Sequence, residues 1–566
     1  MPDVPGAPLP DHPVEPVAAV DPAQPADLAQ SMEPVGSMEP VGSSRLPELS
    51  PDGRPPRRHR RLVRSLVGIG VAVAAVVAAA GGYTLYLNNQ ITHLSVDGLS
   101  PTGTGGGKGT ENILLVGSTS RCALTVQNPA YGLCSRGVTG VNSDVVMVLH
   151  LDSVKRTVSV LSIPRDTFVP NARVAGANKI DAALAEGPTQ LVKAIQLDFG
   201  IPIQHYIQLN FETFANVVDA LGGVKMYFPE PVYDAFSGLN VPAAGCRSLD
   251  GIHALQVVRT RHLQHRSGAV SNNPLTWPQE VESDLARIRR NHEFLRVMAS
   301  AVAEQGLGNP LTDEHIIGAI ASKLEVDSGL TTAHLASLAL TFHAVNINGA
   351  PQLTLPIVST NFGSYHYKGG DYGDIVWPSQ PEDRQVIRQF LGLGPNTDTM
   401  TGKTLPAPGS VTVAVLNGTG VPMAAATTSA RLGALGFPVV HTGVTPSVGR
   451  QSETVVYASP GNIAAAQTVL DQLSGNAVLG ANPVFETPGA LVTVVTGSSF
   501  TVNGPDGASP APTSTAPAPA ASAGSHGHRG TPTPAPSASA PTATAASEGL
   551  APWDPRSCTA AGTAGP

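Results

Sequence analysis

An uncharged apolar run from Leu66 to Leu87 constrains this chain more than any other feature of its sequence. As a helix that rises about 1.5 Å per residue, the run would reach about 33 Å, and a bilayer core is about 30 Å thick. The run is too long for the apolar part of a cleaved signal peptide, and it begins only after residue 60. We therefore predict one transmembrane helix at residues 66–87.

The charges beside this run predict its orientation. Six arginines precede it with no acidic residue among them, whereas Asn88-Asn89-Gln90 follow it without a cluster of Lys or Arg. The positive-inside rule then keeps the N-terminus in the cytoplasm and places the chain from about residue 88 onward outside. We expect a single-pass protein of the cell membrane with extracytoplasmic C-terminal domains. The six arginines are Arg54, Arg57, Arg58, Arg60, Arg61 and Arg64.

Both ends of the chain have compositions that do not support a folded core. Residues 1–65 are Pro-rich and acidic and end in the six arginines named above. Residues 501–566 are dominated by Ala, Pro, Ser and Thr. Such segments bury too little apolar surface to offset the entropy lost on ordering, so we expect both to be disordered. We interpret His526-Gly-His528 in the second as incidental rather than as a metal site. The net charge of −8 argues against a nucleic-acid partner, which needs a basic face.

Strand-like and helix-like patterns alternate between the span and the C-terminal tail. Apolar runs at 113–116, 145–149 and 158–161 predict strands, and residues 187–199, 211–221 and 284 to about 304 predict helices. This alternation indicates an α/β fold with a mixed sheet covered by helices. We predict a linker at 88–110, a first domain at 111–392, a second linker at 393–409 and a small α/β domain at 410–500.

Arginines and acids gather at particular places in the first domain. Arg165 follows a strand, near the strand end where α/β proteins usually bind ligands, and Asp144 begins another strand. Arg259 and Arg261 are spaced by two, which puts both side chains on one side if the backbone is extended. Three more residues fall on one face of the helix that starts near 284. They are Asp284, Arg287 and Asn291.

Several arginines in a domain of low charge density indicate an anion site. One arginine alone is more often part of a surface salt bridge, but only 13% of the residues of this chain are charged. Guanidinium groups match phosphate geometry with bidentate hydrogen bonds, so a group of them suits a pyrophosphate. A carboxylate such as Asp144 would hold Mg²⁺ against the same phosphates.

The same residues lie in motifs that resemble the LytR-CpsA-Psr family of membrane-anchored wall ligases. The resemblance covers about residues 110–305, and about residues 410–500 resemble the small C-terminal domain often attached to that family. The order and number of the matching stretches make it more specific than any single motif. They are Asn112-Ile-Leu-Leu-Val-Gly117, Ser143-Asp144, Leu161-Ser-Ile-Pro-Arg-Asp-Thr167, Lys179-Ile-Asp-Ala-Ala183, Val217-Val-Asp-Ala-Leu-Gly-Gly223, Val258-Arg-Thr-Arg261 and Asp284 to Arg290.

The resemblance implies a phosphotransferase that moves a glycopolymer from a polyprenyl-pyrophosphate carrier to peptidoglycan. It implies catalytic roles for Arg165, Asp144 and Arg287, and a site for Mg²⁺, with Mn²⁺ as the alternative, at Asp144 and Asp284. An apolar groove for the lipid is expected from residues 187–221. The residues implied to bind the pyrophosphate are Arg121, Arg165, Lys179, Arg259, Arg261, Arg287 and Asn291.

The sequence departs from the family pattern in two places. Thr119 stands where the family usually has the Asp of a Gly-Ser-Asp motif, and Asn291 with His292 replaces the Gln that usually follows the helical arginines. The first change removes one expected metal ligand. Two other functions therefore stay open: a catalytically weak protein that binds polyprenyl phosphate or wall glycan, and a polyprenyl-pyrophosphate hydrolase.

Four cysteines lie in the part of the chain expected outside the cell, where disulfides form. Four cysteines allow three pairings. We favour Cys122–Cys134, which flank the first loop and would close a short ring worth about 3 kcal/mol in the loop-entropy model. Cys246 and Cys558 are then the remaining pair.

Overall fold

The computed structural model describes residues 86, 88–89, 91–122, 124, 133–137, 139–268, 271–304, 324–342, 345, 349–359, 364–445, 453–504 and 549–558. The N-terminal segment at 1–65 and all of the expected span at 66–87 except Tyr86 lie outside these residues. Among the described helices, none combines the length and the apolar character needed to cross a bilayer. All of the described residues belong to one compact unit, which comprises residues 75–566.

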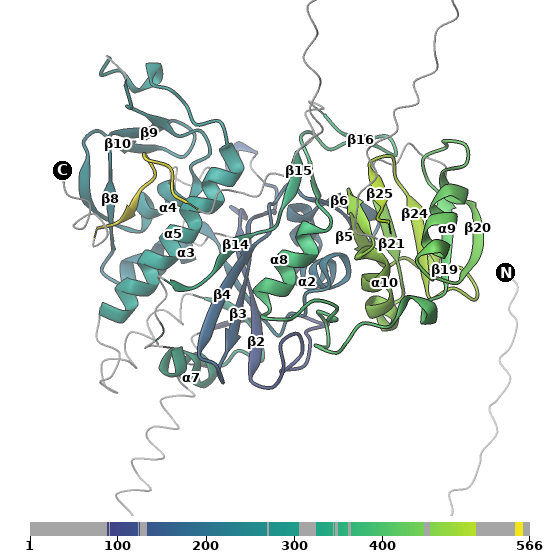
Figure 1. Ribbon diagram of the computed structural model, residues 1–566. Coiled ribbons are helices and arrows are strands. Elements are labelled where there is room, and N and C mark those ends of the chain that lie inside the picture. The colour runs from purple at the N-terminus through teal and green to yellow at the C-terminus, as the bar shows by residue number, and fades with distance from the viewer. Residues whose placement is uncertain are drawn as a thin grey trace, which may run out of the picture. The chain divides into compact units, whose positions relative to one another are not determined.

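A seven-stranded mixed sheet forms the centre of the larger domain, in the order β1-β13-β7-β2-β3-β4-β14. Figure 1 labels four of its strands, β2, β3, β4 and β14. β2 pairs antiparallel with β3 and parallel with β7, and β3 pairs antiparallel with β4. The strands predicted at 113–116, 145–149 and 158–161 lie in β2, β3 and β4, and the predicted α/β class is confirmed. The strands are β1 (Thr92–Leu94), β2 (Thr110–Ser118), β3 (Ser143–Asp152), β4 (Thr157–Ser162), β7 (His205–Leu209), β13 (Glu325–Asp327) and β14 (Gln352–Thr354).

Alternation of side chains along the strands gives this sheet two apolar faces. Leu114 and Val148 belong to a buried cluster that includes residues of α2 and α8. Ile113 and Leu151, which point the other way, belong to a cluster that includes residues of α7. Helices therefore cover both faces, as the alternating pattern predicts. The helices are α2 (Pro188–Ala194), α7 (Thr332–Phe342) and α8 (Glu382–Phe390).

Side-chain caps fix the start of two helices beside the sheet. Asn210 accepts a hydrogen bond from Thr213 N (2.9 Å), and Thr213 Oγ1 accepts one from Asn210 N (2.7 Å), which is the reciprocal arrangement of a capping box. Asp250 accepts one from His253 N (2.9 Å). These residues begin α3 and α4, which pack against each other, and α4 also packs on α5. The helices are α3 (Phe211–Ala220), α4 (Gly251–Arg259) and α5 (Ser283–Glu304).

The helix predictions are confirmed at 211–221 and from 284 to 304. The pattern at 187–199 proves to be two elements, α2 and a π-helical turn at Ile195–Phe199. Shorter strands lie around them. They are β5 (Phe168–Arg173), β6 (Gly176–Lys179), β8 (Val224–Phe228), β9 (Val232–Asp234), β10 (Leu239–Val241), β11 (Gly245–Leu249), β12 (Gln264–His265), β15 (Ile357–Ser359), β16 (His366–Tyr367), β17 (Gly370–Asp371) and β18 (Val376–Pro378).

The smaller domain contains a five-stranded mixed sheet in the order β20-β19-β24-β21-β23. Its apolar cluster joins strand residues such as Val415 and Val494 to Leu432 of α9 and Val469 of α10. The valine pairs Val439-Val440 and Val455-Val456 lie in β20 and β21. The elements are β19 (Val413–Asn417), α9 (Ala424–Ala434), β20 (Val439–Val444), β21 (Thr454–Tyr457), α10 (Ile463–Leu470), β22 (Leu473–Gly475), β23 (Ala477–Gly480), β24 (Val492–Thr496) and β25 (Phe500–Val502).

Both expected linkers contain residues that belong to the packed structure. In the first, β1 pairs in parallel with β13 and so extends the large sheet. In the second, Thr399 is fully buried, donates from Oγ1 to Gly200 O (2.6 Å), and donates from its backbone N to Gln467 Oε1 (3.1 Å). These contacts join segments far apart in sequence, which Gly and Pro content along the chain cannot indicate.

The C-terminal tail, expected to be disordered from 501 to 566, differs from that expectation at residues 549–558. Here β26 (Arg556–Ser557) pairs antiparallel with β8 (Figure 1), and Cys558 forms a disulfide with Cys246. The Trp553 ring stacks on His265 at 3.9 Å between ring centroids. Asp554 is fully buried and accepts hydrogen bonds from two arginines of α5. We name residues 549–558 the C-terminal clasp.

Candidate active site

Asp144 and Arg165 meet at one end of the large sheet. β3 begins and β4 ends there because the two strands are antiparallel, so residues from the two ends become neighbours. Arg165 Nη1 donates a short hydrogen bond to Asp144 Oδ1, and Arg165 Nε lies 3.3 Å from Asp166 Oδ2. The sequence pattern thus placed Arg165 correctly near a strand end, and the structure adds Asp144 as its partner.

Asp166 connects three cations of the site. Besides Arg165, its carboxylate binds Lys179 Nζ, which is 2.8 Å from Oδ1, and lies 3.9 Å from Arg261 Nη2. Asp166 stands in one of the matching motifs but was not among the predicted site residues. Its position directly after Arg165, at the end of a strand, was the available signal.

One face of α5 adds Asp284 and Arg287 to the same cluster. Asp284 Oδ1 lies 2.8 Å from Arg287 Nη2, 3.3 Å from Arg261 Nε and 3.9 Å from Arg165 Nε. Arg287 Nη2 also donates to the backbone oxygen of Asp144 (2.7 Å). We call the residues in this arrangement the arginine cluster. They are Arg165, Lys179, Arg261 and Arg287 with Asp144, Asp166 and Asp284.

Arg259 and Arg261 reach the site by a different route from the one expected. They do not lie on an extended strand, because α4 continues through Arg259 and the helix ends at Thr260, which has extended geometry (φ −62°, ψ 125°). The helix end turns Arg259 over the Phe211 ring, with 4.7 Å from its guanidinium carbon to the ring centroid. Arg261 instead lies beside Asp284.

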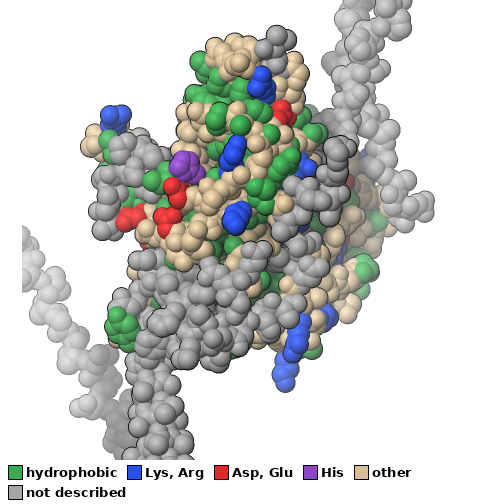
Figure 2. Space-filling model, turned by 90° about the vertical axis from the view of Figure 1, so that its left-hand side faces the viewer, with side chains coloured by type: hydrophobic (Ala, Val, Ile, Leu, Met, Phe, Trp, Pro, Cys, Tyr) green, Lys and Arg blue, Asp and Glu red, His purple; other side chains and the backbone are tan. Residues whose placement is uncertain are grey.

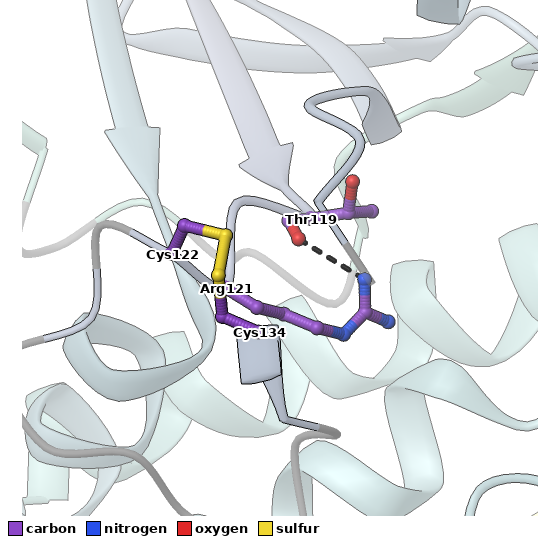
Figure 3. Close-up of a disulfide and its surroundings, with 4 residues drawn as sticks. All are labelled: Thr119, Arg121, Cys122 and Cys134. Carbon is purple, nitrogen blue, oxygen red and sulfur yellow. Dashed lines mark hydrogen bonds between the residues drawn. A yellow bond between two sulfur atoms is a disulfide. The ribbon is translucent and has the colours of Figure 1, made fainter. Parts of the chain in front are cut away.

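Arg121 lies over the same ring, 5.1 Å from its centroid. The predicted Cys122–Cys134 disulfide is confirmed, with 5.1 Å between the two Cα atoms, and it follows Arg121 directly (Figure 3). Arg121 Nη1 donates to the backbone oxygen of Thr119 (3.2 Å), as Figure 3 shows. The disulfide and this hydrogen bond limit the positions that Arg121 can take.

Burial opposes the charges of the arginines at the site. It lowers the pKa of Arg287 and that of Arg259, for which the neighbouring Arg121 acts in the same direction. Burial also acts against Arg165, but three carboxylates outweigh it and raise the pKa of Arg165. An anion beside Arg259 and Arg287 would restore stabilisation that these groups lose when they leave water.

The pKa values of two carboxyl groups near Arg165 are shifted in opposite directions. Burial would raise the pKa of Asp166, but Arg165 and Lys179 outweigh it and lower that pKa. Burial, followed by repulsion from Asp166, raises the pKa of Asp181 to about 6. The net charge of the site therefore changes with pH near 6.

An apolar pocket of about 160 Å³ opens beside the cluster, between the large sheet and α3, α4 and α5. Its polar end contains Asp144, Arg259, Arg287 and Asn291. Of the stretch 187–221, expected to line a lipid groove, only residues between 209 and 217 line this pocket, because Leu191, Ile195 and their neighbours pack in the core on the other face of the sheet. The apolar lining includes Met147, Leu209, Phe211, Phe214, Val217, Leu255, Val258, Phe294, Leu295 and Met298.

The residues at the two departures from the family pattern make hydrogen bonds within the fold. Thr119 Oγ1 accepts a hydrogen bond from Asn142 N (3.0 Å) and donates one to Asn142 O (3.2 Å), so its hydroxyl joins two backbone segments. His292 points away from the pocket lining, since its Nε2 lies 2.7 Å from Ser162 Oγ. Burial, helped by Arg296, lowers the pKa of His292 to about 4.

Asp144 and Asp284 are the residues of the cluster that would hold a magnesium ion together with a substrate. Both carboxylate oxygens of Asp284 are buried and, within the described residues, accept no hydrogen bond of good geometry despite the nearby arginines. Mg²⁺ is usually held by one or two carboxylates together with substrate phosphates. Thr119 supplies no further carboxylate. Of the three carboxylates in the cluster, Asp166 already contacts Arg165, Lys179 and Arg261, which leaves Asp144 and Asp284 for an ion.

Folding brings cations together at this site, although the sequence has no excess of basic residues. On the face shown in Figure 2, the described Lys and Arg side chains lie singly among hydrophobic and other residues. Six cations from five separate segments nevertheless converge around the polar end of the pocket. They are Arg121, Arg165, Lys179, Arg259, Arg261 and Arg287.

A family model identifies the family of this chain. The family model described as the LytR_cpsA_psr family matches residues 87–375, which is half of the chain, and this chain belongs to that family. A second model, described as the LytR cell envelope-related transcriptional attenuator, matches residues 410–500. The predicted family resemblance is confirmed for both domains.

Several curated proteins are similar to this chain. The probable cell wall biosynthesis protein LcpB of Corynebacterium glutamicum is 32% identical over 326 residues, which are 57% of this chain and 69% of LcpB. The cell wall biosynthesis protein LcpA of the same organism is 27% identical over 453 residues, 71% of this chain and 82% of LcpA. The polyisoprenyl-teichoic acid–peptidoglycan teichoic acid transferase TagV of Bacillus subtilis is 25% identical over 297 residues, 50% of this chain and 71% of TagV.

Solved structures with a similar fold include a LytR-Csp2A-Psr enzyme from Actinomyces oris. It is 23% identical, with a TM-score of 0.40, and the match covers 53% of this chain and 95% of that one. The structure of TagV from B. subtilis is 20% identical, with a TM-score of 0.38, and the match covers 50% and 98% of the two chains.

Proposed function

We propose that this chain is an extracytoplasmic phosphotransferase that moves a glycopolymer from a polyprenyl-pyrophosphate carrier to peptidoglycan. We further propose that residues 66–87 anchor it in the cell membrane. One observation supports the substrate class most directly: the pocket is lined mainly by apolar side chains, and Arg259 and Arg287 are among its few polar lining residues. A ligand with a hydrocarbon chain and an anionic head matches this combination. The name of TagV, a teichoic acid transferase, agrees with this proposal.

The arginine cluster would bind the two phosphates. A pyrophosphate diester has one negative charge on each phosphate, and the carboxylates of the cluster hold Arg165, Arg261 and Arg287 in place beside it. Guanidinium groups fixed in this way need little reorganisation when charge develops in the transition state. The hydrocarbon chain would lie among residues of α3, α4 and α5, with Asn291 near the junction.

In the proposed reaction an acceptor sugar hydroxyl attacks the phosphorus atom attached to the glycopolymer. A new O–P bond forms, the bond from that phosphorus to the bridging oxygen breaks, and polyprenyl phosphate leaves with the bond electrons. The hydroxyl proton passes to a carboxylate of the cluster or to water. Bound Mg²⁺ at Asp144 and Asp284 would neutralise phosphate charge during this step.

A transfer assay with the full chain in detergent tests the proposal. The substrates are a polyprenyl-pyrophosphate-linked oligosaccharide and a peptidoglycan acceptor, and mass spectrometry follows the products with Mg²⁺ and with chelator. We expect a phosphodiester-linked glycan on the acceptor, formed only with the metal. Arg165→Ala should reduce turnover by at least about 100-fold, because a preorganised donor to the phosphates is lost.

A matched arginine variant separates this effect from a general loss of charge. Arg247 is exposed on β11 and donates to the backbone oxygens of Ala243 and Ala244, so Arg247→Ala should keep full activity. Bound lipid without product would contradict the transfer and favour a binding protein. Released sugar phosphate with an unmodified acceptor would favour a hydrolase.

A further inference from the structure

A second group of ionisable side chains lies at the opposite end of the large sheet from the arginine cluster. Glu111 near the start of β2, His205 at the start of β7 and His334 on α7 each place one ligand atom within 4.8 Å of those of the other two. His334 Nε2 is 2.9 Å from Glu111 Oε2, and the two imidazole rings are 5.0 Å apart between centroids. Three elements of the fold therefore converge on one point.

This group is separate from the proposed catalytic centre. Glu111 and Gly117 are six residues apart on β2, which is about 20 Å along an extended strand. His205 pairs with Ile113 near one end of β2, whereas Leu209, which lines the apolar pocket, pairs with Gly117 at the other. A ligand bound by Glu111 and the two histidines would not touch the pyrophosphate site.

A fourth residue, Asp327, orients His205 through a contact with Nδ1 of its ring. Asp327 Oδ2 lies 3.1 Å from His205 Nδ1 and accepts a hydrogen bond from Tyr206 N (2.9 Å), while Oδ1 accepts one from Gly329 N (2.8 Å). The Asp327 side chain is only 1% exposed, so these contacts fix it in place. With Nδ1 directed at Asp327, the lone pair of His205 is left on Nε2. A carboxylate behind a histidine is the usual outer support of a metal-binding imidazole.

We propose that Glu111, His205 and His334 bind one zinc ion, with water completing the coordination. Two imidazoles and one carboxylate suit Zn²⁺ rather than Mg²⁺, which takes oxygen ligands. Zinc bonds of about 2.0–2.2 Å need donor atoms about 3.0–3.6 Å apart, so small side-chain rotations from the present separations are sufficient. Zn²⁺ would replace the proton shared by His334 and Glu111.

The surroundings permit both entry and retention of an ion. The side chains of Glu111 and His334 are 19% and 31% exposed, so water and ions reach them, whereas His205 is 10% exposed. Around them, Ile113, Ile207 and Leu335 form part of an apolar cluster. A bound ion would connect α7 to two strands of the sheet, so we expect it to stabilise this end of the domain rather than take part in the transfer.

Zinc binding to the full chain in detergent tests this proposal. The chain carries His526→Ala and His528→Ala so that the tail pair does not contribute, and excess Mg²⁺ is present to occupy oxygen sites. We expect one zinc per chain after dialysis and a higher midpoint of thermal unfolding. His334→Gln and Glu111→Gln should each weaken Zn²⁺ affinity by at least about tenfold in competition with a chromogenic chelator.

The matched control is His253→Gln. His253 forms a 2.7 Å pair with Asp250 that resembles the His334–Glu111 pair but has no third ligand among the described residues. This variant should bind zinc as the parent chain does. Absent zinc, or zinc that His334→Gln and Glu111→Gln leave unchanged, would overturn the proposal. Co²⁺ in place of Zn²⁺ gives a readout independent of stability, since its visible absorption should show imidazole coordination in the parent chain and lose it in His334→Gln.

Discussion

Two arginines one turn apart on α5 are held in different ways. Arg290 is fully buried and makes a bidentate pair with Glu280 (2.7 Å to each oxygen), a third contact with Asp554 (3.1 Å) and a hydrogen bond to Thr260 O (2.8 Å). Arg287 lies 2.8 Å from Asp284 and 2.7 Å from a backbone oxygen, and it lines the apolar pocket. Arg290 therefore faces two carboxylates in a closed environment, whereas Arg287 faces one beside an open pocket.

The comparison shows that residue type and spacing do not distinguish a structural arginine from a ligand-binding one. Residues three apart on a helix differ in direction by about 60°, which is enough to give them different partners. What separates them is the amount of negative charge that the fold already supplies. An arginine that is fully neutralised by the fold has no capacity left for a phosphate, and one that is incompletely neutralised does.

Removing Arg290 should have the largest effect on stability. Arg290→Ala leaves Glu280 buried without its cation and leaves Asp554 with Arg289 alone, so we expect the free energy of unfolding to fall by about 3–5 kcal/mol. Urea unfolding followed by tryptophan fluorescence measures this change. Arg290→Lys keeps the charge but not the bidentate geometry and should lose less. A loss below about 1 kcal/mol for Arg290→Ala would show that the buried pairs do not differ from surface ones.

Removing Arg287 should affect turnover more than folding. Arg287→Ala deletes a guanidinium group from the polar end of the pocket, and we expect transfer activity to fall by about 100-fold or more. The midpoint of unfolding should change less than in Arg290→Ala, because Asp284 keeps Arg261 and Arg165 as neighbours. The transfer assay and urea unfolding of the same preparation measure both quantities. Equal losses of stability in the two variants would remove the distinction between the arginines.

His292, two residues beyond Arg290, should make stability depend on pH. Its pKa is lowered from 6.5 to about 4 by burial and by Arg296. Between these values the unfolded chain binds a proton at this position and the folded chain does not, so lowering the pH favours unfolding. We expect a loss of up to about 3 kcal/mol as the pH falls from about 6.5 to about 4. Comparison of His292→Asn with the parent chain isolates this contribution, and identical pH profiles would contradict it.

Removing the disulfide that attaches the C-terminal clasp should have the smallest effect on stability. Cys558→Ser breaks the bond to Cys246 but leaves the contacts of Asp554 and the pairing of β26 with β8, so we expect a loss of about 1–2 kcal/mol, below the usual range for a disulfide. Trp553 fluorescence should follow detachment of the clasp during unfolding, because its ring stacks on His265 while the clasp is bound. A loss as large as that of Arg290→Ala would mean that the disulfide, and not Asp554, holds the clasp.

Local patterns predicted the elements of the fold better than their assembly. The strands around Ile113 and Val148 and the long helix from Asp284 follow from side-chain periodicity, which depends on neighbours in sequence. The β1–β13–β7 edge of the sheet was missed because β1 is only three residues long and pairs with a strand more than 200 residues away. Strand order depends on such distant pairings, which no local window contains.

The arginine cluster was predictable in its members but not in its connections. Arg165 and Asp144 could be expected at neighbouring strand ends, and Asp284 and Arg287 on one helical face. The central position of Asp166 depends on how β6 brings Lys179 beside it, which is a tertiary contact. The clasp was not predicted, for another reason. Its ten residues were judged together with a long segment rich in Ala, Pro, Ser and Thr, although Trp553 and Cys558 depart from that composition.

The disulfide between Cys246 and Cys558 also determines what proteolysis of this chain would release. The smaller domain's last described residue is 504 and the clasp begins at 549, so the sequence between them is attached to described structure at both ends. A single cut between residues 505 and 548 would leave two fragments that are still covalently linked through the disulfide. Gel electrophoresis should therefore show one species without reductant and two with it, and the nicked protein should keep Asp554 bound to Arg290.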